Sequence, residues 1–444
     1  MNRPAIRGRV TTAAVVAGLA VSLAASGVAT ADPLPGCSDQ GWLGVWAAAP
    51  SDASGGTDDM DRYDLSMNPK SVVRDETIRA ILTPTFGGTT ARVRLSNRFG
   101  TAPVTFAQAT VARRATGPAV VPESVAPLSF GGNRSVTVAP GQDVLSDPVG
   151  VAVQAFEPLA VSLHVAGDIG KPTEHAVARQ TSYFTPEGSG DHTGDVDGSS
   201  FTQRTTSRPF VSGVEVLAPM SDGAVVALGD SITDGYQAVP AGAPETLEGI
   251  DADGRWPDDL ARRLAAADRP LSVLNLGIAG NRVLQDSVVG GQPDVQGAAV
   301  IRRLDADVAT LSGVTTVIWL EGINDVLMSP NASVDQLTGG YREVIDRLHA
   351  QGLRVLQGTL TPAGGSSGLT AGSEAVRQAV NAWIREQSPA DGVVDFDAAV
   401  RDPAEPSRIN PAYDGSDHLH FNLAGYQAMA NAVPLELITD RACS

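Results

Sequence analysis

The chain has 444 residues, with 50 acidic against 32 basic side chains and a formal net charge of −18. A strongly acidic chain repels phosphate backbones and anionic membrane surfaces, so we expect no nucleic-acid partner and no stable membrane association. The length suits two domains better than one core, and the sequence specifies no oligomeric state.

Residues 1–31 have the pattern of a secretory signal peptide. Three arginines, ending at Arg9, precede an apolar run from Ala13 to Val28, and the small residues 29–31 follow at the spacing that signal peptidase accepts. We expect cleavage after Ala31 and a secreted, extracellular product of 413 residues with a net charge of −21. The alternative is an uncleaved membrane anchor.

Residues 32–218 are predicted to form an antiparallel β-sandwich-like domain. Ala91, Val93 and Leu95 alternate with polar residues, as do the apolar residues of 159–165, and this period of two is typical of half-buried strands. Gly and Pro interrupt the segments at short intervals, and no long stretch has helical periodicity.

From residue 219 to residue 444 the pattern changes to alternating strands and helices. The run 224–228 is continuously apolar, as in a strand buried on both faces of a parallel sheet. Further strands are predicted at 273–276, 316–320, 355–360 and 393–396, and helices at 257–267, 337–348, 375–385 and from 423. This alternation predicts a parallel sheet with helices on both faces, in a domain that follows the first at the boundary between residues 218 and 219.

A candidate nucleophile follows the first of these strands. Ser231 lies in the segment Gly229–Gly235, and functional groups gather beyond the carboxyl ends of the strands in open α/β sheets. A serine hydroxyl there needs an adjacent base to remove its proton. The alternative is that Ser231 only caps a helix.

Two histidines directly before the last helix are candidates for that base. Asp417 is close enough to His420 to orient its ring and to stabilise an imidazolium. Spacing alone leaves a second pairing open, that of Asp414 with His418. A third histidine, His349, lies late in a helix, where a cation near the C-terminus is the simpler explanation.

Two other loops that follow strands offer donors for a developing oxyanion. Gly280 lacks a Cβ, so its N–H can approach a substrate closely. Asn324 carries a carboxamide that can donate. Either loop alone could be a simple turn, but four such loops in order, each after a strand, point to acyl transfer.

Together these segments resemble the four sequence blocks of the SGNH (GDSL) hydrolase superfamily. The blocks are Gly229-Asp230-Ser231, Gly280, Gly322-x-Asn324-Asp325 and Asp417-x-x-His420, in order over residues 225–426. The resemblance implies a flavodoxin-like three-layer α/β/α domain and no cofactor. It assigns Ser231 as nucleophile, with Asp417 and His420 as its partners, and it implies an oxyanion hole of Ser231 N–H, Gly280 N–H and Asn324.

The N-terminal region is similar to a two-domain, exported bacterial branch of that superfamily that is grouped with acetylxylan esterases. The similar segments are Trp42–Ala48, Arg94–Asn97 and Arg179–Tyr183. Phe421 is a departure, because the branch usually has proline after the histidine, and we expect it to affect the rim of the pocket.

The resemblance implies a serine esterase acting through an acyl-enzyme on a small-molecule or carbohydrate ester. We expect short acyl groups such as acetyl. The alternatives are a lipase or phospholipase, and a polysaccharide-binding protein whose hydrolase domain is vestigial. A metalloenzyme with ligands from Asp230 and from His418-x-His420 with Asp417 is the other enzyme class that the residues allow.

Two further expectations concern Cys37 and Cys443 and the loop Asp191–Gly198. The two cysteines lie near the ends of the mature chain, where termini often meet, and export permits a disulfide between them. The loop carries three aspartates, but its spacing departs from the EF-hand pattern, so a solvated turn is favoured over a calcium site.

Overall fold

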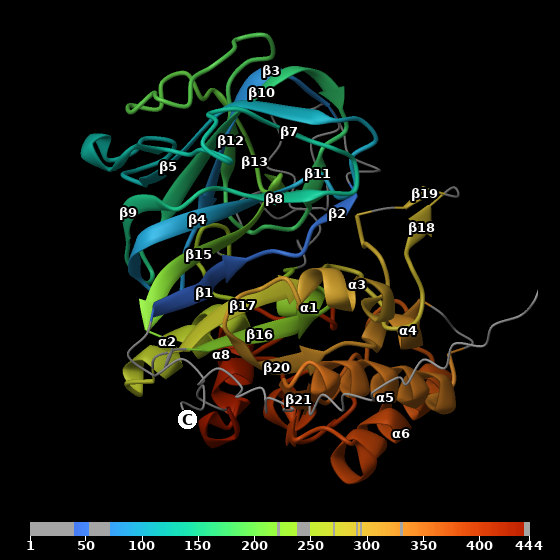
Figure 1. Ribbon diagram of the computed structural model, residues 1–444. Coiled ribbons are helices and arrows are strands. Elements are labelled where there is room, and N and C mark those ends of the chain that lie inside the picture. The colour runs from blue at the N-terminus through green and yellow to red at the C-terminus, as the bar shows by residue number, and fades with distance from the viewer. Residues whose placement is uncertain are drawn as a thin grey trace, which may run out of the picture. The chain divides into compact units, whose positions relative to one another are not determined.

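The computed structural model describes residues 40–52, 72–219, 223–237, 249–269, 271–289, 292–293, 295–328 and 332–438 (Figure 1). The predicted signal peptide and both Cys37 and Cys443 lie outside the described residues, so the cleavage site and the disulfide stay predictions. Residues 36–444 form one compact unit, and the division at residues 218 and 219 stays a prediction. Among the described residues, no helix is both long and apolar enough to cross a membrane.

Before residue 220, the described residues form three antiparallel sheets. The first has the order β1-β15-β4-β8, with β9 also paired to β4. Its strands are β1 (Gln40–Ala47), β4 (Gly88–Ser96), β8 (Asp143–Leu145), β9 (Val149–Val153) and β15 (Val211–Pro219). The alternation predicted at 91–95 is confirmed in β4, where Ala91, Val93 and Leu95 are buried and the two arginines between them are partly exposed.

The second sheet has the order β13-β12-β3-β10-β5-β6, with β7 paired to β5. Its strands are β3 (Val73–Leu82), β5 (Val104–Arg113), β6 (Ala126–Pro127), β7 (Val136–Val138), β10 (Leu159–Gly170), β12 (Ser182–Phe184) and β13 (Gln203–Thr205), and a 3-10 turn, η1 (Pro122–Ser124), precedes β6. The third sheet is small, with β11 (Thr173–His175) between β14 (Arg208–Pro209) and β2 (Ser51–Asp52).

Strand β10 differs from the half-buried strand that its sequence predicted. Ala160 and Ser162 are buried as well as their apolar neighbours. Ala160 packs in a small cluster with Ile81 and Val120, and Ser162 Oγ accepts a hydrogen bond of 2.8 Å from Arg79 Nε. The polar face of β10 is therefore covered by protein, which local alternation does not reveal.

One apolar core joins the two larger sheets. It contains Val93 and Val214 from the first sheet and Val111 and Leu163 from the second. The inward faces of both sheets therefore lose their contact with water together.

The second part of the chain forms a parallel sheet of five strands in the order β17-β16-β20-β21-β22. The strands are β16 (Gly223–Gly229), β17 (Leu271–Gly277), β20 (Val314–Leu320), β21 (Arg354–Gly358) and β22 (Gly392–Val394). All five predicted strands are present. The last is shorter than predicted, because Phe396 already begins a helix.

Helices follow the strands of this sheet, as Figure 1 shows. They are α1 (Ser231–Asp234), α2 (Trp256–Ala266), α3 (Val300–Asp307), α4 (Ile323–Leu327), α5 (Val334–Ala350), α6 (Ala371–Gln387), α7 (Phe396–Val400) and α8 (Leu423–Ala432), with a 3-10 turn η2 (Leu435–Leu437). A two-stranded ribbon of β18 (Val288–Val289) and β19 (Gln292–Pro293) precedes α3.

Both faces of the parallel sheet are covered. Val226 and Leu228 of β16 belong to one apolar cluster, and Val225 and Ala227 belong to another. The first cluster includes residues of α3, α5 and α6, and the second includes residues of α2, α7 and α8. Continuous apolar strands are needed here because successive side chains enter two different cores.

The described residues before 220, here called the β-rich part, pack against β17, the edge strand of the parallel sheet. Ser272 Oγ of β17 donates a hydrogen bond of 2.5 Å to Gly44 O of β1, and Gly44 N–H donates one of 2.9 Å to Ser312 O. A Cβ at Gly44 would lie 2.9 Å from Leu274 Cδ1, so the close approach of β1 favours glycine.

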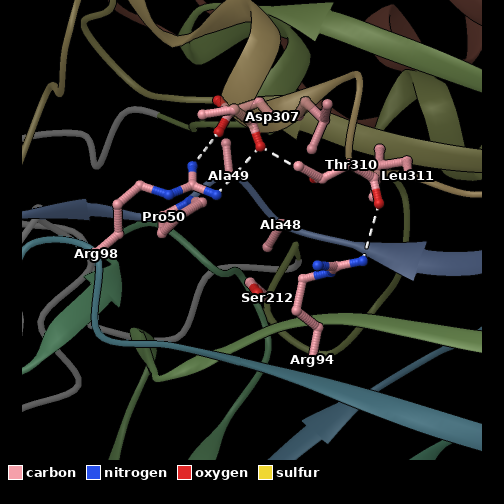
Figure 2. A pocket seen from close by; sticks show the side chains of 11 residues that line it. Ala48, Ala49, Pro50, Arg94, Arg98, Ser212, Asp307, Thr310 and Leu311 are labelled. Atoms are coloured by element: carbon pink, nitrogen blue, oxygen red, sulfur yellow. Dashed lines mark hydrogen bonds and ion pairs between the residues drawn. The ribbon is translucent and has the colours of Figure 1, made fainter. Parts of the chain in front are cut away.

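Two arginines near the end of β4 reach the end of α3 (Figure 2). Arg94 Nη2 donates a hydrogen bond of 2.9 Å to Thr310 O, and Arg98 Nη1 lies 2.5 Å from Asp307 Oδ1. The second oxygen of Asp307 lies 3.0 Å from Arg303 Nη1 within α3. Asp307 thus links Arg98 of the β-rich part to the buried Arg303 of the α/β part, which comprises the described residues from 223 onward. A small pocket lies beside this contact.

Candidate active site

Ser231 is the first residue of α1, directly after β16. Asp230 is the N-cap and accepts a hydrogen bond of 3.0 Å from Ile232 N–H. Gly235, with φ +90°, ends the helix in the left-handed region that glycine tolerates. The helix is one turn long, and it holds Ser231 buried at the carboxyl edge of the sheet.

The structure brings Ser231, His420 and Asp417 together. His420 Nε2 lies 2.8 Å from Ser231 Oγ, and His420 Nδ1 lies 2.6 Å from Asp417 Oδ2. An ionised carboxylate only accepts hydrogen bonds, so the Nδ1 hydrogen points to Asp417. In the neutral ring this leaves Nε2 as the acceptor for the Ser231 hydroxyl, as a general base requires.

Asp417 is held in its ionised form. Burial raises its pKa, but hydrogen bonds from the His420 ring and from the backbone N–H groups of His420 and Leu419 outweigh this effect and lower the pKa to about 2. The carboxylate can therefore orient the ring and balance an imidazolium charge at any pH above about 4.

The two aspartate–histidine pairings that spacing left open both form. His418 Nδ1 lies 2.5 Å from Asp414 Oδ2, but this pair is on the exposed side of the loop. The histidine that contacts Ser231 Oγ is His420. His349 contacts Asp391 on the surface, away from these residues.

Phe421 lies in the core, and its effect on the pocket rim stays a prediction. Its side chain is fully buried and packs against Tyr426, with the ring centroids 5.7 Å apart. A Cβ at Gly425 would lie 2.9 Å from Phe421, so the start of α8 sits tightly on this ring. The residue after the histidine therefore anchors the loop in the core.

The three predicted oxyanion donors follow adjacent strands of the sheet. Ser231 follows β16, Gly280 follows β17 and Asn324 follows β20, and these strands are neighbours. Within the described part of the chain, the N–H groups of Ser231 and Gly280 donate to no other group. Asn324 Nδ2 donates one hydrogen bond, of 2.9 Å, to Asn281 O and keeps its second hydrogen.

Residues 278–281, here called the oxyanion loop, are fixed by several contacts. Gly280 has φ +79°, and a Cβ there would lie 2.5 Å from Gln296 Cδ, so this position requires glycine. Asp325 accepts hydrogen bonds from the N–H groups of Val283 and Leu284, at 2.8 and 3.0 Å, and holds the chain just beyond the loop.

Arg303 contacts the oxyanion loop, and no sequence pattern identified it. Its guanidinium donates to Gly229 O, Leu276 O and Asn281 Oδ1 at 2.9 to 3.1 Å. It thus ties the ends of two strands to the oxyanion loop. Arg303 also forms an ion pair with Asp307, and Asp307 in turn contacts Arg98. Arg303 therefore connects the oxyanion loop to the β-rich part.

A group of buried carboxyl groups surrounds this arginine. Burial raises the pKa of Asp230 to about 7 despite the hydrogen bond from Ile232 N–H, and the nearby charge of Asp325 adds to the rise. Burial also raises the pKa of Asp325 to about 6 and that of Glu321 well above its usual range. Oδ2 of Asp230 is buried and has no hydrogen-bond partner among the described residues.

The raised pKa of Asp230 predicts a stability that falls as pH rises. Between about pH 4 and pH 7 the unfolded chain loses this proton while the folded chain keeps it, so the free energy of unfolding decreases over that window. Asp230→Asn keeps the helix-capping oxygen and removes the charge. We compare the change in Tm between pH 5 and pH 8. We expect this change to be about 2–4 °C more favourable for Asp230→Asn than for the unmodified protein.

Thermal unfolding followed by circular dichroism from pH 5 to pH 8 measures this difference. Asp335→Asn, at an exposed aspartate in the first turn of α5, is the matched control and should reproduce the unmodified curve. Parallel curves for Asp230→Asn and the unmodified protein would contradict the assignment of the raised pKa to Asp230.

The β-rich part also contributes residues near the site that the sequence did not reveal. His175 Nε2 lies 2.9 Å from Asp234 Oδ1 in α1. Ala176 and Val177 share an apolar cluster with Ala279 of the oxyanion loop. Asp234 lies in the segment Gly229–Gly235, but the sequence analysis assigned no role to it. That unexplained aspartate was the only sequence feature that could have pointed to this contact.

Tyr236 lies against the ring of His420, with the ring centroids 4.6 Å apart. It also packs against the apolar cluster formed by Ala176 and Val177. The histidine ring is therefore held on one side by a tyrosine that the β-rich part supports.

The residues named for a metal or calcium site have other contacts. Both ring nitrogens of His420 have partners, and His418 contacts Asp414. In the loop 191–198, Asp191 accepts from Thr193, Asp195 from His192 and Ser200, and Asp197 from Ser199. Among the described residues, no three histidine, cysteine or acidic side chains form a group that could hold a metal ion.

Residues 227–428 match the family model of the GDSL-like Lipase/Acylhydrolase family. No curated protein matches the chain significantly. Among solved structures, the aryl esterase of M. smegmatis is 20% identical, covers 47% of this chain and 95% of its own, and has a TM-score of 0.38.

Two other solved structures are similar over the same share of the chain. A carbohydrate acetylesterase from Sinorhizobium meliloti is 17% identical, with 47% of this chain and 95% of that chain covered and a TM-score of 0.38. An α/β hydrolase enzyme from the metagenome of Lake Arreo, Spain, is 23% identical, with 47% and 92% covered and a TM-score of 0.34.

The protein is a carboxylic ester hydrolase. Over residues 227–428 it carries a domain of the GDSL-like lipase/acylhydrolase family, so the predicted membership of the GDSL superfamily is confirmed.

Proposed function

We propose that the protein is a secreted serine esterase that removes short acyl groups, such as acetyl, from carbohydrate through an acyl-enzyme. The observation that carries the proposal is the hydrogen-bonded series Ser231 Oγ, His420 and Asp417, with distances of 2.8 and 2.6 Å. A nucleophile, a base and a group that orients the base are the three parts that acyl transfer to serine needs.

The reaction has two steps. Ser231 Oγ attacks the ester carbonyl carbon while His420 Nε2 accepts the hydroxyl proton, and Asp417 stabilises the imidazolium. Ser231 N–H, Gly280 N–H and the free carboxamide hydrogen of Asn324 hold the oxyanion. His420 then protonates the leaving alcohol as the C–O bond breaks, and water repeats the sequence on the acyl-enzyme to release the acid and the free serine.

The preference for short acyl groups is supported by the packing beside the oxyanion loop. Ala279 is buried against Ala176 and Val177, and all three are less than 10% exposed. Protein atoms therefore fill the space on this side of Gly280. We therefore place no long acyl chain on this side of Gly280, where an acetyl group needs no space.

Export and the scaffold are part of the same proposal. The signal-peptide pattern of residues 1–31 supports secretion. A flavodoxin-like three-layer α/β/α domain is supported by the strand order, which is 2-1-3-4-5 in chain numbering, and by the two apolar clusters on the faces of the sheet. The core shared by the two larger antiparallel sheets supports a β-sandwich before it.

A series of p-nitrophenyl esters from acetate to palmitate tests the acyl preference, together with acetate release from acetylated xylan. We expect kcat/KM to fall steeply beyond butyrate and acetate to be released from the polysaccharide. Ser231→Ala serves as the blank. A maximum at long chains would make the protein a lipase or phospholipase, and binding of the polysaccharide without turnover of any ester would make it a binding protein.

A further inference from the structure

A second buried histidine–aspartate pair lies beside the oxyanion loop, and its histidine comes from the β-rich part. His175 ends β11, Asp234 ends α1, and both are at most 5% exposed. His175 Nε2 lies 2.9 Å from Asp234 Oδ1, and Asp234 Oδ2 accepts a hydrogen bond of 2.9 Å from Ala279 N–H. Because Ala279 directly precedes Gly280, one carboxylate connects the histidine to the oxyanion loop.

Both ring nitrogens of His175 have an oxygen partner. Nδ1 lies 2.9 Å from Ala49 O, a carbonyl that can only accept, and Nε2 faces the carboxylate of Asp234. The ring is thus held between a backbone carbonyl of β-rich residues and a carboxyl group at the end of α1. Three cationic groups from other positions also attract the charge of Asp234: Arg179, Arg208 and Arg255.

His175 and Asp234 therefore form a buried hydrogen-bonded pair with little freedom to move. A buried polar group that loses its hydrogen-bond partner is unfavourable, so each group fixes the position of the other. The end of β17 also packs tightly against α1, since a Cβ at Gly277 would lie 2.2 Å from Asp234 N. The end of α1 and the oxyanion loop are thus held as one assembly.

We propose that His175 is a positioning residue for the oxyanion hole. It holds the Asp234 carboxylate, which holds the peptide N–H of Ala279, and this fixes the direction in which Gly280 presents its own N–H. The inference rests on the proposed role of Gly280. It gives the β-rich part a role in catalysis, because His175 is the only residue of the described β-rich part that hydrogen-bonds to this carboxylate.

The test compares His175→Ala with the unmodified protein on p-nitrophenyl acetate. A donor that is displaced by about 1 Å loses about 10²-fold in rate, so we expect kcat to fall by about 10²-fold. We expect KM to change by less than about twofold, because the oxyanion contact forms mainly in the transition state. Rates are expressed per active site, counted by stoichiometric labelling with a fluorophosphonate, so that misfolded protein does not contribute.

If His175→Ala does not fold, His175→Gln provides a second test of the same contact. Glutamine can donate one hydrogen bond to Asp234, so we expect it to recover about tenfold of the lost kcat. His164→Ala is the matched control, since His164 also contacts an aspartate, with Nε2 3.1 Å from Asp75 Oδ1, but lies in β10. We expect its kcat to equal that of the unmodified protein.

Asp234→Ala and the double variant with His175→Ala show whether the histidine acts through the aspartate. If it does, the double variant loses no more kcat than Asp234→Ala alone. Unchanged kcat in His175→Ala, equal losses in His175→Ala and His164→Ala, or additive losses in the double variant would each overturn the inference. If the unmodified protein hydrolysed no ester, the proposed function would fall instead.

Discussion

Ser231→Ala is expected to lower kcat on p-nitrophenyl acetate by about 10⁶-fold, the size of loss found when a nucleophilic serine is removed from such a catalytic unit. The substitution removes only Oγ, which has His420 Nε2 as its hydrogen-bond partner. Loss of one such bond costs about 1 kcal/mol of stability. We therefore expect Tm to fall by less than about 4 °C.

Labelling with a fluorophosphonate gives an independent measurement of the same residue. The mass increase should map to Ser231 in the unmodified protein and be absent from Ser231→Ala. Ser366→Ala is the control, because Ser366 also has a hydroxyl bound within a loop of the α/β part, to Ala363 O at 2.7 Å. Turnover above a few per cent in Ser231→Ala would remove this serine from the mechanism.

The second large effect is expected for Asp417→Asn, with a loss in kcat of about 10⁴-fold. Asparagine can present its NH₂ to His420 Nδ1, which then has to accept, so the Nε2 hydrogen points at Ser231 and the ring cannot take the serine proton. KM should change little because the substrate does not contact this carboxylate. Single-turnover acylation rates would measure the loss directly.

The same loop supplies a matched control for this substitution. Asp414→Asn alters an aspartate of the same type, whose histidine, His418, points away from Ser231. We expect its kcat to stay within about threefold of the unmodified protein. The reverse order, with Asp414→Asn inactive and Asp417→Asn active, would transfer the role to His418.

The ionisation of Asp417 also has a defined effect on stability. Its pKa of about 2 in the folded chain lies below the value of about 3.9 in an unfolded chain. Its contribution is therefore complete above about pH 4 and is lost as pH falls through about 2. Any loss of activity that begins above pH 5 has another origin.

The sequence predicted the elements whose signals are local. The apolar run at 224–228 identified β16, and the alternation at Ala91, Val93 and Leu95 identified β4, because each pattern depends only on which faces of one strand are buried. The candidate residues Ser231, Gly280 and Asn324 were visible for a similar reason, since each directly follows a predicted strand.

The misses have one physical cause, which is contact between segments far apart in the chain. The second buried face of β10 depends on Arg79 and on the cluster with Ile81. Arg303 and His175 act on groups that are 22 to 74 residues away from them. No periodicity or spacing in one segment encodes such partners.

The pairing of β1 with β15 has a consequence for how the protein is made. Gln40 lies opposite Pro219, and β15 is the only described strand that pairs with β1, so β1 stays unpaired until nearly the whole β-rich part has been synthesised. At about 5–20 residues per second the delay is roughly 10 to 35 seconds. During that time the apolar strand, with Trp42 and Trp46, has an unpaired edge, and such edges aggregate. A chaperone that binds this segment should therefore raise the yield of folded protein more than one that binds the α/β part.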